Sequence, residues 1–233
     1  MLRALLRLAL ISISAVIVVF LGLFFMRMVG HRQVFQPPPH AWFDKPSWKI
    51  YRPDAASACS PEAPSDWIIN IRVRRKDHEW LVDCAAPKAL SEVLSRSKHI
   101  DWLLSVDGNE TSDLDKFVDI VEQHDREKAF AVHARSQTLA RYLRKKSPQW
   151  IYAADTASLL RLHLFSSLWL ETAMDFWPDF VIAGVADKAS GSLIGVREAE
   201  ELKRRHKRIV WEASTDSETP LVPVQGLLTN RIP

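Results

Sequence analysis

The chain has 233 residues, with 31 Lys and Arg against 28 Asp and Glu, so its formal net charge is only +3. The basic residues are scattered rather than gathered on one stripe, which argues against a dedicated nucleic-acid surface. The length suits one membrane segment followed by one domain of roughly 170–200 residues.

The first long apolar segment runs from Leu8 to Met26 and contains no charged residue. At a rise of about 1.5 Å per residue it can cross a hydrocarbon core of about 30 Å. It ends in bulky residues rather than in the small residues of a cleavage site, so we predict an uncleaved N-terminal transmembrane anchor over residues 1–32. Arg3 and Arg7 precede the segment and slightly favour a folded domain on the non-cytoplasmic side.

Residues 33–46 are predicted to form a linker, because Pro37, Pro38 and Pro39 favour an extended, semi-rigid spacer. The folded domain is then expected over residues 47–233. Cys59 and Cys84 are the only cysteines, too few for a zinc site built from cysteines. They are either two separate buried thiols or one disulfide, and a disulfide would require an oxidising compartment.

Short apolar strands and helices alternate through the domain. The predicted strands cover residues 48–52, 67–73, 99–106, 128–132, 150–154, 180–185, 208–213 and 226–229. A further short strand over residues 80–84 is expected to form a hairpin with the second of these. The predicted helices cover residues 88–98, 112–124, 136–146, 156–174 and 196–206. This alternation predicts an α/β fold, a shortened TIM-like (β/α)₈ barrel without its first helix. An open doubly wound sheet is the alternative, although no glycine-rich turn follows an early strand to mark a nucleotide site.

Three segments resemble the second half of the glycerophosphodiester phosphodiesterase family. They are QWIYAADTASLLRLHLFSSLWL from Gln149 to Leu170, KRIVWE from Lys207 to Glu212, and the ending GLLTNRIP. The resemblance implies a barrel of the PI-PLC-like phosphodiesterase superfamily, a role in lipid metabolism, and hydrolysis of phosphoric diesters by two histidines and a bound cation.

The first half departs from the family at the residues that carry this chemistry. The family's His-Arg-Gly is matched by Tyr51, Arg52 and Pro53, and its Glu-x-Asp metal pair by Ile69 and Ile71. We therefore expect branched aliphatic side chains to close the mouth of the barrel where an ion's oxygen ligands would otherwise stand. Replacing buried carboxylates by isoleucine also removes the free-energy cost of desolvating them.

Two further motifs are lost in the same way. The second catalytic histidine falls on Asp83, and the Glu-x-Lys of the third strand falls on Ser105 and Asp107; Glu62 is matched to the family's Pro-Glu-Asn. One general acid or base contributes about 10²–10⁴ in rate, so losing both histidines and the metal should abolish the family's reaction. No cofactor is expected, and Ca²⁺ or Mg²⁺ only if hydrolysis survives.

Other polar residues at the predicted strand ends offer weaker catalytic candidates. Asp107 and Glu212 are candidate metal ligands. His133 is a candidate base, and Asp107 and Asp83 are further weak catalytic candidates. Arg52 and Arg135 are candidate phosphate-binding residues, since the guanidinium fork suits phosphate without any catalysis. For each residue the alternative is an ordinary ion pair or hydrogen bond at the rim of the barrel.

Two surface features have two interpretations each. The basic run from Lys203 to Arg208 is either the solvated last turn of a helix or a contact with anionic lipid headgroups. Leu164, Phe165, Leu168 and Trp169 are either helix core or an apolar lip for an acyl chain.

The resemblance and its departures together predict a membrane-anchored, phosphodiesterase-like barrel with a degenerate site. We expect a pseudoenzyme that binds or scaffolds at the membrane, with phospholipid headgroups or another membrane protein as its partner. The alternative is an active phosphoric diester hydrolase, acting on glycerophosphodiesters or lipid headgroups through a rearranged site. A third possibility is a structural membrane component with no ligand.

Overall fold

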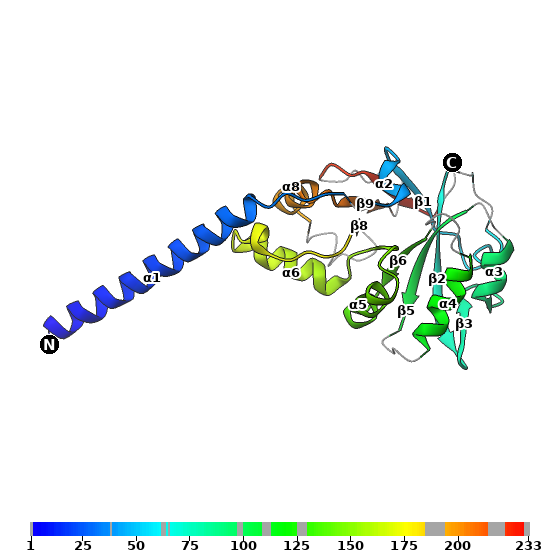
Figure 1. Cartoon of the computed structure of the whole chain (residues 1–233), viewed down its shortest axis with the longest axis horizontal. Coiled ribbons are helices and arrows are strands. Elements are labelled where there is room, and N and C mark those ends of the chain that lie inside the picture. The colour runs from blue at the N-terminus through cyan, green and yellow to red at the C-terminus, as the bar shows by residue number, and fades with distance from the viewer. Residues whose placement is uncertain are drawn as a thin grey trace.

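A computed structural model of the chain describes residues 2–37, 39–61, 64, 66–96, 100–108, 113–124, 130–184, 194–213 and 222–230. Glu62 lies outside these residues. The described chain consists of one long N-terminal helix, α1 (Leu2–His31), and a domain built around a ring of strands (Figure 1).

Eight parallel strands form the ring among the described residues, in the order β7-β6-β5-β2-β1-β10-β9-β8. They are β1 (Trp48–Tyr51), β2 (Ile68–Lys76), β5 (Asp101–Asp107), β6 (Phe130–Ala134), β7 (Ile151–Tyr152), β8 (Phe180–Gly184), β9 (Arg208–Glu212) and β10 (Gly226–Thr229). A parallel bridge between Ala153 and Phe180 joins the two ends of this order, and the backbone N–H of Ala154 donates to the carbonyl of Phe180 over 2.8 Å. The predicted TIM-like barrel is confirmed, and the open doubly wound sheet is wrong.

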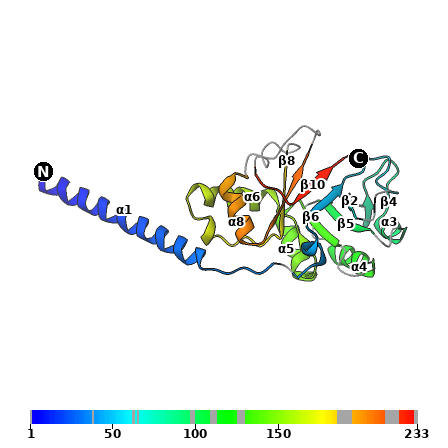
Figure 2. The same ribbon diagram turned by 90° about the horizontal axis from the view of Figure 1, so that it is seen from above.

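Helices cover the outside of the ring (Figures 1 and 2). They are α3 (Leu90–Arg96), α4 (Leu114–His124), α5 (Gln137–Lys146), α6 (Thr156–Ser167) and α8 (Val196–Arg204). The single helix predicted over residues 156–174 is wrong: α6 stops at Ser167, and a 3₁₀ helix, η1 (Glu171–Ala173), follows. Trp169 has a φ of 63°, and this left-handed backbone ends the helical path.

Three small elements lie outside the ring. The second strand of the hairpin, expected over residues 80–84, is β3 (Glu79–Val82), which pairs with β2. It also pairs with β4 (Lys88–Ala89), a short strand where the start of a helix was expected. A short helix, α2 (Ala41–Asp44), lies within the predicted linker. Its Trp42 is buried, and the Trp42 carbonyl accepts a 2.7 Å hydrogen bond from the Trp48 indole N–H, so the packed domain includes this segment.

The apolar core has separate inner and outer layers, because successive strand residues point to opposite faces. Inside the ring one buried cluster takes residues from every strand: Trp48, Ile50, Ile68, Leu103, Ala131, Ile151, Phe180, Val210 and Leu228. On β2, Ile69, Ile71 and Val73 belong to a different cluster, which packs under α3, α4 and α5. The same alternation turns Asn70 and Arg72 towards the inside of the barrel.

A disulfide joins Cys59 and Cys84, whose Cα atoms are 5.8 Å apart and which are separated by 25 residues in sequence. It ties the segment after β1 to the end of the β2–β3 hairpin. The alternative of two separate thiols is therefore wrong.

Helix α1 leaves the domain beside α6 and α8 (Figures 1 and 2). Its segment Leu10–His31 has a mean hydropathy of 2.4 and is long and apolar enough to cross a membrane, and its apolar part is not buried against the domain. A signal sequence near an N-terminus would pass the same test of length and composition.

Candidate functional site

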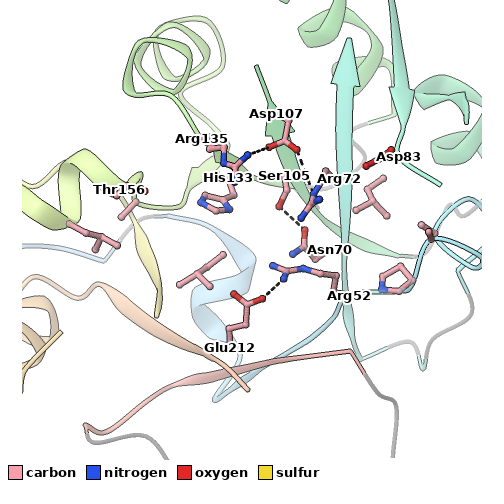
Figure 3. A pocket seen from close by; sticks show the side chains of 17 residues that line it. Arg52, Asn70, Arg72, Asp83, Ser105, Asp107, His133, Arg135, Thr156 and Glu212 are labelled. Carbon is pink, nitrogen blue, oxygen red and sulfur yellow. Dashed lines mark hydrogen bonds and ion pairs between the residues drawn. The ribbon is translucent and has the colours of Figure 1, made fainter. Parts of the chain in front are cut away.

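The carboxyl ends of the barrel strands open into a cavity of ≈ 430 Å³ (Figure 3). Polar side chains from different strands and loops converge on it. They are Arg52, Asn70, Arg72, Asp83, Ser105, Asp107, His133, Arg135, Thr156 and Glu212. In a (β/α)₈ barrel this is the end where ligands bind, so the cavity is the candidate site.

The expectation that aliphatic side chains close this mouth is wrong. Ile69 and Ile71 are 0% and 1% exposed, and both belong to the outer cluster under the helices. Ile71 borders the cavity together with Ala58, a member of the same cluster. The side chains of β2 that face inward are Asn70 and Arg72. A one-residue difference in register therefore exchanges an apolar face for a polar one.

One ion pair crosses the mouth between β1 and β9. The guanidinium of Arg52 bonds to the carboxylate of Glu212, and the two side chains are mostly buried (Figure 3). The backbone N–H of Arg52 also donates to the carbonyl of Thr229 over 2.8 Å, which fixes the start of the side chain. Arg52, predicted to hold phosphate, is thus already occupied by an internal anion, and Glu212, predicted as a metal ligand, by an internal cation.

A second group of charges is held more loosely. Asp107 lies between two arginines, with Oδ2 3.5 Å from Nε of Arg72 and Oδ1 3.7 Å from Nη1 of Arg135 (Figure 3). Both distances are longer than a good charge-assisted hydrogen bond. The two arginine side chains are 58% and 79% exposed. Their remaining N–H groups can therefore bind a further anion.

The carboxylates of this cavity do not fit a divalent cation. Asp107 and Glu212 are paired with arginines, and Asp83 lies 3.2 Å from Arg74. Within the described part of the chain no group of three acidic, His or Cys side chains converges as metal ligands would. A cation would have to displace a guanidinium from each carboxylate, so Asp107 and Glu212 are poor candidates for a metal site.

The floor of the cavity holds a polar pair that is only half satisfied. The Ser105 hydroxyl donates to Oδ1 of Asn70 over 2.8 Å, while Nδ2 of Asn70 is buried and has no partner. Turning the amide over would only transfer the deficit to its oxygen. An unsatisfied buried amide costs about 1–3 kcal/mol, and such a group is expected where a ligand completes the site.

His133 is held in its neutral form. Burial, reinforced by the positive charge of Arg52 and opposed by Asp107 and Asp155, lowers its pKa from 6.5 to about 4. At neutral pH the imidazole is uncharged, so it can accept a proton but cannot donate one as an imidazolium would. His133 is therefore a possible base and a poor general acid.

Most of the residues singled out in the sequence lie at this mouth, whereas Tyr51 does not line the cavity. Three polar lining residues were not among the candidates: Asn70, Arg72 and Thr156. The alternation of Asn70 and Arg72 with isoleucines along β2 was the signal that could have found these two, since the outer face of a barrel strand packs against helices and must be apolar.

No protein-family model matches the sequence, and no curated protein matches it either. Solved structures do match. A glycerophosphodiester phosphodiesterase from Agrobacterium tumefaciens str. C58 aligns with a TM-score of 0.52 and 9% identity, covering 79% of this chain and 96% of its own. One from Parabacteroides distasonis ATCC 8503 aligns with a TM-score of 0.54 and 12% identity, covering 79% and 93%. The fold is that of the glycerophosphodiester phosphodiesterases.

At this identity the likeness establishes the phosphodiesterase fold and leaves the chemistry to the site itself. A metal-binding Glu-x-Asp pair on the second barrel strand would have to face the mouth. In this phosphodiesterase-like barrel the inward positions of β2 carry an amide, Asn70, and a guanidinium, Arg72. The positively charged Arg72 thus lies where the resemblance would lead one to expect a metal ligand.

Proposed function

We propose that the chain is a membrane-anchored binding protein whose barrel mouth holds a phosphodiester without hydrolysing it. The observation that carries the proposal is the loose Arg72–Asp107–Arg135 group above the unsatisfied amide of Asn70. Phospholipid headgroups and free glycerophosphodiesters share the chemistry that such a group would recognise. The anchoring part of the proposal is supported by the apolar length of α1.

The local charge favours a diester. Asp83 and Glu212 are each paired with an arginine outside the group, and His133 is neutral. Arg72, Arg135 and Asp107 then carry a net charge of +1, which complements the single negative charge of a phosphodiester. The exposed N–H groups of the two arginines would bind its free oxygens, and Nδ2 of Asn70 would donate from below.

The same groups argue against hydrolysis. In-line displacement at phosphorus needs a base for the nucleophile, an acid for the leaving group and stabilisation of the developing charge. Among the described residues that line the cavity, His133 is the only imidazole. It can serve as a base, and this is the observation that favours the alternative of a surviving hydrolase, but no partner acid or metal site accompanies it.

Thermal unfolding of the full chain in detergent micelles tests the proposal. Glycerophosphocholine should raise the midpoint in the presence of a chelator, and Arg72→Gln and Arg135→Gln should each weaken this stabilisation. Arg141→Gln is the matched control, because Arg141 is an exposed arginine on α5 outside the cavity.

The same preparations are assayed for release of choline or glycerol phosphate with Ca²⁺, with Mg²⁺ and with a chelator. The proposal predicts stabilisation without turnover. Turnover that is lost in His133→Gln would establish the hydrolase instead. No stabilisation by the diester in the unaltered chain would refute binding at this mouth.

A further inference from the structure

A stripe of exposed apolar side chains lies on the surface of α6 and at the start of α8. Its members, the α6 stripe, are 48% to 64% exposed: Leu160, Leu164, Leu168, Trp169 and Val196. The three leucines are four residues apart and so share one face of the helix and its end. This arrangement excludes the interpretation of Leu164, Leu168 and Trp169 as helix core, whereas Phe165 does pack against the core.

The opposite face of α6 is buried in the domain through Leu159 and Leu162. The helix is therefore apolar on its buried face and also along an exposed stripe, although Arg161 and His163 lie on the same helix. A surface helix in water is expected to keep its exposed face polar, so a stripe of exposed leucines indicates a nonaqueous neighbour. Contiguous exposed apolar surface of this kind marks contact with a protein or a membrane.

The position of Trp169 indicates which neighbour this is. Arg27 is the first charged residue after the apolar segment of α1, and its guanidinium lies 4.9 Å from the centre of the Trp169 ring. Arg197 lies 4.3 Å from the same ring. Trp169 is thus level with the end of the apolar segment, where tryptophan and arginine gather at the surface of a bilayer.

The junction between α1 and the domain holds the stripe at this level. The Thr172 hydroxyl donates to the carbonyl of Arg27 over 3.2 Å, and Arg204 donates to the carbonyls of Gly30 and Gln33 over 3.2 and 3.1 Å. Gly30 lies so close to Thr172 that a Cβ would clash with the Thr172 carbonyl. The helix therefore cannot swing freely relative to α6 and α8.

This junction also corrects the interpretation of the basic run as a solvated or lipid-facing helix end. Arg204 binds the end of α1, and Arg205 is buried with its guanidinium on Glu201 and on the carbonyl of Glu171. Lys207 lies 3.5 Å from Asp179. Most of the run thus joins parts of the protein to each other.

The backbone at Trp169 adds an independent observation. Trp169 follows Leu168, the C-cap residue of α6, and has a φ of 63°. Glycine is strongly preferred in this left-handed conformation. Local structure therefore does not require a tryptophan here, and its side chain is 58% exposed. An exposed indole at a position that favours glycine is consistent with a contact outside the domain.

We infer that the α6 stripe inserts into the headgroup region of the leaflet that α1 crosses, with Arg27 and Arg197 beside Trp169 at the level of the lipid phosphates. The occupant of the stripe is the phospholipid surface. The inference rests on the proposed anchoring by α1 and adds a second, interfacial attachment. It orients the barrel mouth relative to the bilayer rather than leaving the domain free on a tether.

The test uses the full chain in vesicles of phosphatidylcholine with a minority of phosphatidylglycerol. An environment-sensitive NBD label is attached at Leu168→Cys and, in a control protein, at Leu227→Cys, since Leu227 is a 45% exposed leucine on β10. We expect a blue-shifted emission that is quenched by headgroup-level spin-labelled lipid for the first label, and water-like, unquenched emission for the control. Trp169→Gly relieves the left-handed backbone, so it should preserve folding and yet reduce the quenching at position 168.

Alkaline carbonate extraction separates failure of this inference from failure of anchoring. Water-like emission at position 168 in a chain that resists extraction would refute the docking and leave the anchor intact. Extraction of the chain by carbonate would refute the anchor and the inference with it. A blue shift that grows with the protein-to-lipid ratio, without quenching by the spin-labelled lipid, would mean that a second copy of the chain covers the stripe. That result would also overturn the inference.

Discussion

Replacing the polar pair on the floor of the cavity should make the ligand-free protein more stable. In the double variant Asn70→Leu/Ser105→Ala, the side chain of Asn70 is replaced by an apolar one of similar size and the hydroxyl is removed. The 2.8 Å hydrogen bond between them is lost, at a cost of about 1 kcal/mol, but so is the orphan amide donor, which costs about 1–3 kcal/mol when buried.

The free energy of unfolding should therefore rise by about 1 kcal/mol in the double variant. For a domain of this size, this corresponds to a rise of roughly 2–4 °C in the unfolding midpoint. Ser105→Ala alone should instead destabilise the protein by about 1–2 kcal/mol, because it leaves both atoms of the amide unpaired. The two changes are thus strongly non-additive, and a double-mutant cycle measures the coupling.

Urea unfolding of the full chain in micelles, with and without glycerophosphocholine, is the assay. Without the diester, the double variant should be more stable than the unaltered chain. Adding the diester should stabilise the double variant less than it stabilises the unaltered chain, as expected where a binding site reduces the stability of the free protein. A double variant destabilised by about 2 kcal/mol or more, well outside the expected range, would show that the amide is satisfied in the free protein. Nδ2 of Asn70 would then give no reason to expect a ligand in the cavity.

Three further predictions concern pH, the disulfide and the register of β2. Folding lowers the pKa of His133 from 6.5 to about 4, so between these pH values the unfolded chain binds a proton that the folded chain does not. The free energy of unfolding should therefore fall as the pH falls from 6.5 towards 4. His133→Gln should flatten this slope in urea titrations at several pH values. Reducing the disulfide should lower stability by about 3 kcal/mol, visible as a lower midpoint with dithiothreitol, and an unchanged midpoint would contradict its structural role. Ile71→Asp should destabilise the folded protein by about 3–5 kcal/mol, because it buries an unpaired charge in the outer core. Arg72→Asp, at the open mouth, should cost less than about 1 kcal/mol. Equal effects of the two changes would show that the assigned faces of β2 are wrong.

The order of strands and helices followed from the sequence because both depend on local patterns. Short apolar segments alternating with amphipathic ones have few solutions other than a parallel barrel or an open parallel sheet. The end of α6 was not predictable in this way. The sequence stays apolar beyond Ser167, and the helix ends where Trp169 takes a left-handed conformation. A tryptophan at this position does not predict such a conformation.

Several residues singled out in the sequence meet at the mouth, but the β2 side chains that line it differ from those expected. His133, Asp107 and Arg135 reach the mouth because they end strands on the inward register. Matching Ile69 and Ile71 to a metal motif overlooked that the apolar face of β2 is needed under the helices.

The pairing of the basic run was also largely beyond local reasoning. Arg204 and Arg205 find their partners at the end of α1 and in η1, far away in sequence. Helical spacing could have indicated only their ion pairs with Glu201, one turn earlier. The contacts with α1 and η1 depend on the tertiary arrangement.

Isothermal titration of glycerophosphocholine into the full chain, in micelles with a chelator, tests the central claim most directly. We expect saturable binding that survives removal of metal, is lost in Arg72→Gln/Arg135→Gln, and is retained in Arg141→Gln, with the diester recovered intact. Absence of binding, or binding and cleavage that appear only when Ca²⁺ or Mg²⁺ is restored, would contradict this claim.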